Sequence, residues 1–404
     1  MNRWSNGQGR DSSVVVDSEI YLDAAAASPP SDAVLAAMQQ VQQHAWANPS
    51  SLHGHGLAAA EVLERCRWQI ATRFGVQPDQ LTITSGATES VHLALLGTAA
   101  RLQPGRLVIS AVEHPAVAAA AQQLQRLGWQ LEHWPVDRRG VIQLDAIDRM
   151  LSPPTRLVSI GAAQGEVGSL QPLPTVAAIC RQRGVILHSD ATQLVPQGLF
   201  DFNRLGVDLL SLSAHKCQGP RGVGLLIRNR EIDLAALLGG GGQEDGNRSG
   251  TEPVALVAGM ATALANLPDY DPSQQLLPPG SVPRLRQQRD TLLAALLNCP
   301  HVQLLGADLE HRLPHHIALL VGRGADDPVA GRTLVRRLAD VGIACSSGSA
   351  CSSGQSSDSA VLTAMDVPKD WRQSGLRLSL GPWLTDEQLD QVPKRFNAVL
   401  RSIA

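Results

Sequence analysis

The apolar run at residues 207–213, Val-Asp-Leu-Leu-Ser-Leu-Ser, and the tetrapeptide Ser213-Ala214-His215-Lys216 that continues it decide the fold of this chain. The run has the composition of a buried strand, and Lys216 lies just past its end. A similar run at residues 185–189 leads directly into Asp190. Ligands of open α/β sheets bind at the carboxyl ends of the strands, so we expect Asp190 and Lys216 to meet at one edge of a sheet.

An amine and a carboxylate at one sheet edge suit the chemistry of pyridoxal phosphate. A lysine amine forms a Schiff base with the aldehyde of this cofactor, and a carboxylate pairs with the pyridinium nitrogen and keeps the ring charged. Taken alone, Asp190 is equally compatible with a helix cap and Lys216 with a solvated surface lysine. The two residues together favour a pyridoxal phosphate site.

Short apolar runs alternate with helical patterns along the chain, and this alternation is typical of a parallel sheet flanked by helices. The expected strands include residues 107–111, 157–161, 185–189 and 208–213. A segment rich in proline and polar residues, 268–283, interrupts the pattern. We therefore expect an N-terminal segment (1–20), a large α/β domain (21–267) and a smaller C-terminal α/β domain (268–404).

Composition indicates a large globular protein. With 404 residues, of which 44% are hydrophobic, the chain can bury a sizeable core. The formal net charge is −3 and no long run has one sign, which argues against nucleic acid or an anionic membrane surface as a partner. Residues 1–17 lack the apolar segment of a secretory signal, and no stretch reaches the ~18 apolar residues of a membrane span. We expect a cytoplasmic location.

The stretch Thr84-Ser85-Gly86-Ala87-Thr88 has the features of an anion site. It follows the β-branched run at residues 81–83 and precedes a helix with apolar periodicity. Backbone amides and hydroxyls at the amino end of a helix can receive a phosphate, and the Ala87 amide and Thr88 are the candidates. Serine and threonine at such a junction are also ordinary helix caps, and this alternative stays open.

Six cysteines occur without a Cys-x-x-Cys pair, so neither a disulfide framework nor a zinc ribbon is indicated. Cys345 and Cys351 lie in a run rich in serine and glycine, which is typical of a loop that exposes a thiol. Cys345 adjoins the strand-like residues 341–344 and is expected to be packed, so Cys351 is the candidate reactive thiol. His315 and His316 would point to opposite faces of a strand, and no metal site is predicted there.

Ordered motifs over most of the chain resemble those of the cysteine desulfurases, fold-type I pyridoxal phosphate enzymes of the class V aminotransferase group. The matching stretches are Tyr21-Leu22-Asp23, Asn48-Pro49-Ser50-Ser51-Leu52-His53, Thr84 to Ser90, Glu113-His114-Pro115, His188 to Gln193, Ser213 to Lys216, Arg248-Ser249-Gly250-Thr251, Ser346-Ser347-Gly348-Ser349-Ala350-Cys351 and Arg377-Leu378-Ser379-Leu380-Gly381. The resemblance implies a large domain with a mostly parallel seven-stranded sheet flanked by helices, plus a smaller α/β domain.

The resemblance also assigns roles to residues. His114 would stack on the pyridine ring and help to move protons, and Gln193 would hydrogen-bond the phenolic oxygen. Ser213 and His215 would complete the phosphate contacts, while Thr251 would reach the site from the second subunit of a homodimer.

Two further roles concern the substrate. Arg377 matches the residue that clamps the substrate carboxylate through a two-pronged ion pair. Gln164, followed by Gly165, replaces the first residue of an asparagine pair that touches cofactor and substrate in the family, and Val91-His92 also departs from the family pattern.

The implied activity is the removal of sulfur from L-cysteine, giving L-alanine and a persulfide on the nucleophile Cys351, with Lys216 removing the α-proton. The loop would then pass the sulfur to an acceptor protein, for example an iron–sulfur scaffold or a thiolation enzyme. Two alternatives stay open: a cystine or selenocysteine lyase with the same cofactor pocket but no need for the loop thiol, and a weakly active binding partner in sulfur transfer.

Overall fold

The computed structural model describes residues 19–268, 283–324, 326–348 and 358–403. Its largest element is a seven-stranded sheet with the strand order β2-β8-β7-β6-β5-β3-β4. The strands are β2 (Leu81–Thr84), β3 (Arg106–Ser110), β4 (Gln130–Trp134), β5 (Thr155–Ser159), β6 (Ile186–Asp190), β7 (Leu209–Ser213) and β8 (Gly224–Arg228). Strand β8 alone runs opposite to the other six strands, which confirms the expected mostly parallel seven-stranded sheet.

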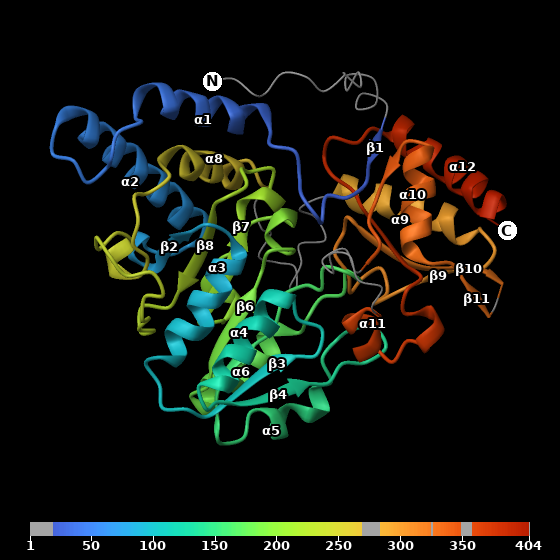
Figure 1. Cartoon of the computed structure of the whole chain (residues 1–404), viewed down its shortest axis with the longest axis horizontal. Helices are drawn as coiled ribbons and strands as arrows, with labels where there is room; N and C mark the ends of the chain where they lie inside the picture. Colours follow the sequence, from blue (N-terminus) through green and yellow to red (C-terminus); the bar gives the residue numbers. More distant parts are fainter. Residues whose placement is uncertain (1–18, 269–282, 325, 349–357, 404) are drawn as a thin grey trace, which may run out of the picture.

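Helices cover both faces of this sheet, as Figure 1 shows. They are α1 (Asp32–His44), α2 (Gly54–Phe74), α3 (Ala87–His92), α4 (Pro115–Arg126), α5 (Ile147–Met150), α6 (Leu173–Arg183), α7 (Phe202–Leu205) and α8 (Val254–Ala265). Every residue of β7 is buried, because helices cover the sheet on both faces. A strand buried on both faces favours apolar side chains on both, which explains the continuous apolar runs in the sequence.

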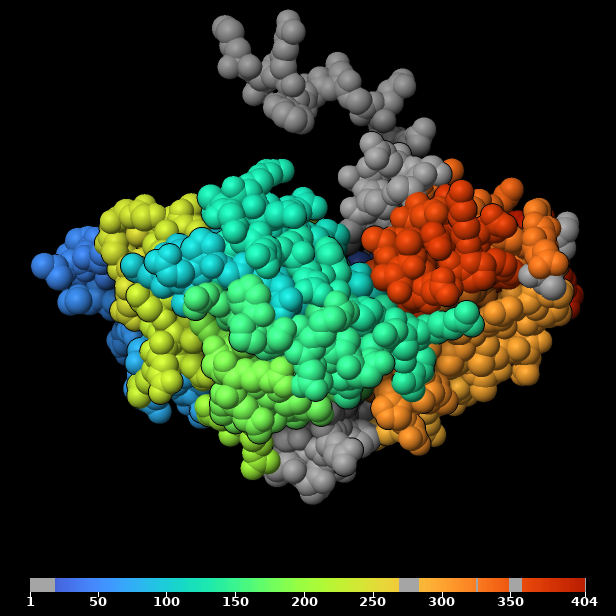
Figure 2. Space-filling model, turned by 90° about the horizontal axis from the view of Figure 1, so that it is seen from below, coloured from blue at the N-terminus to red at the C-terminus, as the bar shows by residue number. Residues whose placement is uncertain are grey.

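A second, four-stranded sheet lies in the C-terminal third of the chain. It consists of β9 (Val302–Leu304), β10 (His316–Gly324), β11 (Asp327–Pro328) and β13 (Gly375–Ser379), and the helices near it are α9 (Pro283–Leu297), α10 (Gly331–Asp340), α11 (Ala360–Ala364) and α12 (Asp386–Ile403). Its core contains Leu293, Leu319 and Phe396. Figure 2 shows this third of the chain, orange to red, beside the rest of the molecule.

The short strand β1 (Ile20–Tyr21) belongs to the C-terminal core rather than to the large sheet. It pairs in parallel with β12 (Ile343–Ala344), and Ile20 and Leu22 are buried among C-terminal residues. The predicted division at residues 20/21 and 267/268 stays a prediction, and the second boundary adjoins the segment 269–282, which lies outside the described residues.

The neighbouring strands β6 and β7 position the candidate site. They are parallel, and Asp190 of β6 is paired in register with Ser211 of β7. Asp190 and the turn after β7 therefore reach the same edge of the sheet. None of the helices in the described part of the chain has the length and apolar character needed to cross a membrane.

Candidate active site

A cavity of about 940 Å³ opens at the carboxyl ends of these strands. Ten of the twelve residues predicted for the site line it: Ala87, Thr88, His114, Gln164, Asp190, Gln193, Ser213, His215, Lys216 and Arg377. They come from positions scattered between 87 and 377, and Arg377 belongs to the second sheet. The cavity therefore lies where the two sheets of the molecule face each other.

Lys216 ends a short 3-10 turn, Ala214–Lys216, directly after β7. Its Nζ donates to the carbonyl oxygens of Ala25 at 2.6 Å and Ala26 at 2.7 Å, so the ammonium group is held on the cavity wall. Sequence reasoning missed these two alanines, because a backbone carbonyl leaves no signature in the residue type. Their contact places a nucleophilic amine inside the cavity.

Asp190 lies at the end of β6, and its Oδ1 accepts a hydrogen bond from the amide of Thr192 at 2.9 Å. The hydroxyl oxygen of Thr192 is buried and has no hydrogen-bond partner among the described residues, although Thr192 lines the cavity. A buried hydroxyl without a partner is costly, so a polar group in the cavity would stabilise it.

The predicted phosphate end is built from two turns. Ala87 and Thr88 begin α3, and on the other side the Ser213 hydroxyl is hydrogen-bonded to His215 Nδ1 at 2.8 Å. Burial, together with the charges of Lys216 and Arg221, lowers the pKa of His215 to about 4, so the ring is neutral near pH 7. The helix after the turn differs from a regular amphipathic helix, because α3 passes into a π-helical turn at Leu93–Gly97.

Glu89 connects this end to a more distant segment. Its carboxylate accepts from the Ser85 amide at 2.7 Å and from Arg248 Nε at 2.8 Å. Burial raises the pKa of Glu89, but the hydrogen bonds from Arg248 and Ser85 outweigh it and the net shift is downward. The pair joins the phosphate end to the stretch that precedes Thr251.

His114 is the cap of α4, and its Nδ1 accepts from the Ala116 amide at 3.1 Å. An accepting Nδ1 places the proton of a neutral imidazole on Nε2. Gln193 Nε2 donates to the carbonyl of Ala25 at 3.0 Å. Gln164 is engaged at both ends: Oε1 accepts from the Glu166 amide at 2.5 Å, and Nε2 donates to the Val112 carbonyl at 3.2 Å. Its contact with cofactor and substrate stays a prediction.

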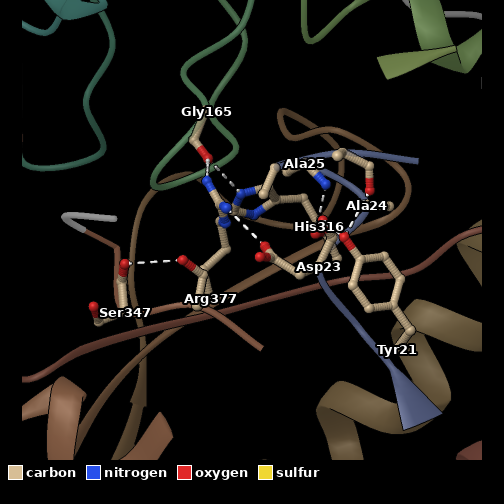
Figure 3. Close-up of polar contacts among 12 residues, drawn as sticks. Tyr21, Asp23, Ala24, Ala25, Gly165, His316, Ser347 and Arg377 are labelled. Carbon is tan, nitrogen blue, oxygen red and sulfur yellow. Dashed lines mark hydrogen bonds and ion pairs between the residues drawn. The ribbon is translucent and has the colours of Figure 1, made fainter. Parts of the chain in front are cut away.

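Arg377 is 6% exposed and lies in the middle of β13. Its Nη2 donates to Asp23 Oδ1 at 2.8 Å and its Nη1 to the Gly165 carbonyl at 2.9 Å (Figure 3). Its Nε is buried and has no hydrogen-bond partner in the described ranges. Sequence reasoning named Asp23 only as part of a motif, and the structure gives it a role in orienting the guanidinium.

Two carboxyl groups on the cavity wall were also missed. Glu113 Oε1 accepts from the Gly161 amide at 2.8 Å, and burial, together with the charge of Asp190, raises its pKa to about 8. Burial also raises the pKa of Glu166, against the opposing effects of a hydrogen bond from Ser359 and the charge of Arg377. In the sequence, only the positions of Glu113 and Glu166 close to His114 and Gln164 pointed to the site. Their burial could not be predicted, because it depends on tertiary packing.

Thr251 and Cys351 are the other two predicted residues. Thr251 is exposed and lines a separate hollow beside the glycine-rich turn 239–242, whereas Cys351 lies outside the described residues and its role stays a prediction. Cys345 is buried, and burial together with the charge of Asp23 raises its pKa to about 12, which confirms the expectation that this thiol is packed. The described residues contain no group of three metal-ligating side chains.

Comparison with known proteins places this arrangement in a family. The class-V aminotransferase family model matches residues 20–392. The chain is 34% identical over 391 residues to a cysteine desulfurase IscS of Dictyoglomus turgidum, covering 96% of both chains. It is 36% identical over 378 residues to the cysteine desulfurase IscS of Klebsiella pneumoniae, covering 92% of this chain and 90% of the relative.

A solved structure described as a NifS-like protein superimposes with a TM-score of 0.85 at 30% identity, covering 95% of this chain and 100% of that one. Sequence and fold therefore agree over nearly the whole length. The chain belongs to the cysteine desulfurase family of class-V aminotransferases.

Proposed function

We propose that this protein is a pyridoxal phosphate-dependent cysteine desulfurase that converts L-cysteine to L-alanine and retains the sulfur as a persulfide on Cys351. The observation that carries the proposal is the placement of the Lys216 amine, the Asp190 carboxylate and the Arg377 guanidinium on one cavity. Family membership supports the same reaction.

The residues present fit the cofactor. The donor set contains an amine for an aldehyde, a carboxylate for a ring nitrogen, and hydroxyl, imidazole and amide groups for a phosphate, and the buried Thr192 hydroxyl still needs a partner. Lys216 would hold the aldehyde carbon, Asp190 the ring nitrogen, and Thr88, Ser213 and His215 the phosphate. When bound, pyridoxal phosphate supplies an electron sink for the bond electrons at the substrate Cα.

The side chains of this chain would carry out the remaining steps. Arg377 binds the substrate carboxylate, and its buried Nε supplies a donor that Asp23 and Gly165 do not occupy. Lys216 Nζ would accept the Cα proton as a general base. The carbonyls of Ala25 and Ala26 orient its Nζ.

Sulfur transfer would occur at Cys351. Its thiolate attacks the substrate sulfur and a sulfur–sulfur bond forms, while the carbon–sulfur bond breaks and leaves its electron pair on the substrate carbon. Protonation of that carbon yields alanine, and the persulfide on Cys351 is the sulfur donor to an acceptor protein, of which an iron–sulfur scaffold is one candidate. No external oxidant is needed, because the substrate carbon is reduced as the two sulfurs join.

A homodimer with shared sites is also proposed. Exposed apolar side chains occur on α1, on α2, in the connection between these helices and just before the glycine-rich turn: Leu35, Trp46, Leu52, Leu57, Trp68, Leu237 and Leu238. The buried pair Arg67–Glu244, at 2.8 Å, ties α2 to the segment that leads to Thr251. A second copy on this surface would cover the apolar side chains and let Thr251 reach the neighbouring phosphate end.

Mixed dimers test the shared site. In a dimer of one Lys216→Ala and one Thr251→Ala subunit, one site carries both changes and the other carries neither. Activity above that of either parent dimer is expected, and a mixed dimer without any gain would refute the exchange of Thr251.

The reaction itself is tested by incubating the purified protein with L-cysteine and assaying alanine and sulfide with and without a reductant. A desulfurase releases sulfide mainly when a reductant cleaves the persulfide. Alanine formation that does not depend on Cys351 would instead favour a lyase.

A further inference from the structure

His316, the first residue of β10, is joined to the arginine of the site through one carbonyl group. Its Nε2 lies 3.1 Å from the Gly165 carbonyl oxygen, which also accepts from Arg377 Nη1 at 2.9 Å (Figure 3). A carbonyl oxygen has no proton to give, so the ring nitrogen is the donor. Gly165 therefore connects His316 to the guanidinium that is predicted to bind the substrate carboxylate.

The ring of His316 is fully buried and uncharged. Burial, together with the charges of Arg377 and Arg312, holds its pKa well below the ordinary value. A neutral ring carries one proton, so donation from Nε2 leaves Nδ1 as an acceptor, and Nδ1 is buried without a hydrogen-bond partner in the described ranges. An apolar side chain would fill this space without the cost of an unpaired acceptor. The Nε2 donor is therefore the property that histidine adds at this position.

The turn that carries Gly165 is packed against the start of β10. The Gly168 amide closes this turn on the Gln164 carbonyl at 2.8 Å, and the Gly168 carbonyl accepts from the Leu313 amide at 2.9 Å. Gly168 has a φ of +80°, and a Cβ added there would lie 2.6 Å from His316 Nδ1. Glycine allows both this backbone conformation and the close approach of the ring. The imidazole thus lies directly against the turn whose carbonyl it holds.

Asp23, the other acceptor of the Arg377 guanidinium, is held from the same sheet. Ser379 of β13 makes backbone hydrogen bonds, at 2.8 and 3.2 Å, to the residues on the two sides of Asp23. Ser379 is also the partner of His316 in the register between β10 and β13. One cross-strand pair therefore anchors both acceptors of the guanidinium.

We propose that His316 is a positioning residue for recognition of the substrate carboxylate: its Nε2 holds the Gly165 carbonyl, and this carbonyl fixes the direction in which Arg377 presents its remaining donors. The inference rests on the proposed function and deepens it, because it states how the site selects an amine that carries a carboxylate. A guanidinium whose acceptors are fixed loses little freedom when a carboxylate binds, so its affinity is higher than that of a mobile one.

The test uses two ligands of the holoenzyme, L-alanine and ethylamine. Ethylamine is alanine without the carboxylate, so the two differ in the group that Arg377 is proposed to bind. Both dissociation constants are measured from the absorbance of the bound cofactor. A dissociation constant does not depend on the fraction of the protein that is folded, so a loss of stability alone does not change it. The wild type should bind L-alanine more tightly than ethylamine.

His316→Asn and His316→Gln are matched amide variants that differ in reach. The glutamine amide can place its donor near the position of Nε2, whereas the asparagine amide ends near Nδ1 and falls short of the Gly165 carbonyl. In His316→Asn we expect the dissociation constant of L-alanine to rise about five- to tenfold, as for the loss of one uncharged hydrogen bond, and that of ethylamine to change by less than about twofold. His316→Gln should bind L-alanine to within about twofold of the wild type. His311→Asn, at an exposed histidine, is the control without effect.

A double variant tests whether His316 acts through Arg377. In the Arg377→Lys background the guanidinium is already absent, so adding His316→Asn should raise the dissociation constant of L-alanine by less than about twofold. Independent contributions from the two residues would instead multiply.

Four results would overturn the inference: unchanged L-alanine affinity in His316→Asn, equal weakening of both ligands, a Gln variant as weak as the Asn variant, or multiplied losses in the double variant. The second would indicate a general effect on the cavity, and the third a need for the imidazole ring rather than for its donor. A wild-type holoenzyme that forms no alanine from L-cysteine would instead refute the proposed function, so the two failures are distinguishable.

Discussion

Arg377→Lys tests the assignment of the substrate carboxylate to β13. Lysine keeps the positive charge beside Asp23 but loses the planar guanidinium, so the Gly165 hydrogen bond and the second prong toward a carboxylate both disappear. A hydrogen bond between charged groups contributes about 1.5–3 kcal/mol, which corresponds to a decrease of about 10- to 100-fold in kcat/KM for L-cysteine. The residue is 6% exposed, so solvent screening does not reduce this value much.

The assay is alanine formation at limiting L-cysteine, with the absorbance of the bound cofactor as a check on folding. Arg312→Lys is the matched control, because Arg312 is an equally buried arginine that donates to the carbonyls of Ala307 and Leu305 away from the cavity. It should lower stability and leave kcat/KM unchanged. A change below about twofold in Arg377→Lys, or equal losses in both variants, would refute the carboxylate assignment.

Three further predictions concern the cofactor end of the cavity. Burial raises the pKa of Glu113 to about 8 in the native state, against an ordinary value of 4.5. The native state therefore keeps a proton that the unfolded chain releases, and the free energy of unfolding falls as pH rises between these two values. Glu113→Gln should flatten this pH dependence in urea unfolding at pH 5.5 and 8, and an unchanged slope would contradict the argument. Lys216→Ala should abolish the borohydride-trappable cofactor linkage, and a linkage at another lysine would show that the site is misassigned. Arg248→Met leaves the Glu89 carboxylate without its ion-pair partner near the phosphate end and should weaken cofactor binding by about tenfold in a spectrophotometric titration. The double variant with Glu89→Gln should bind the cofactor as the wild type does. Additive losses of affinity in the double variant would exclude the unpaired charge as the cause.

Much of the fold was predictable because its information is local. Strands covered on both faces require continuous apolar runs, so residues 208–213 and 185–189 predicted β7 and β6 to within about one residue. The parallel arrangement then brought Asp190 and Lys216 to one edge, since the ends of parallel strands coincide.

What could not be predicted depends on contacts between distant parts of the chain. The pairing of β1 with β12 joins residues 20 and 343, and no local pattern specifies that partner. The carbonyls of Ala25 and Ala26 hold Lys216 through backbone atoms, which every residue type possesses. The burial of Glu113 arises only after several elements have packed together, and it is this burial that raises its pKa.

In the proposed reaction, sulfur leaves L-cysteine and arrives on Cys351. The direct measurement is mass-spectrometric mapping of persulfide after a pulse of L-cysteine, in the wild type and in the Cys351→Ser and Cys345→Ser variants. We expect persulfide on Cys351 in the wild type and in Cys345→Ser, because burial keeps the Cys345 thiol protonated, and none in Cys351→Ser although cofactor and substrate still bind. Persulfide on Cys345 alone, or undiminished persulfide in Cys351→Ser, would contradict the account.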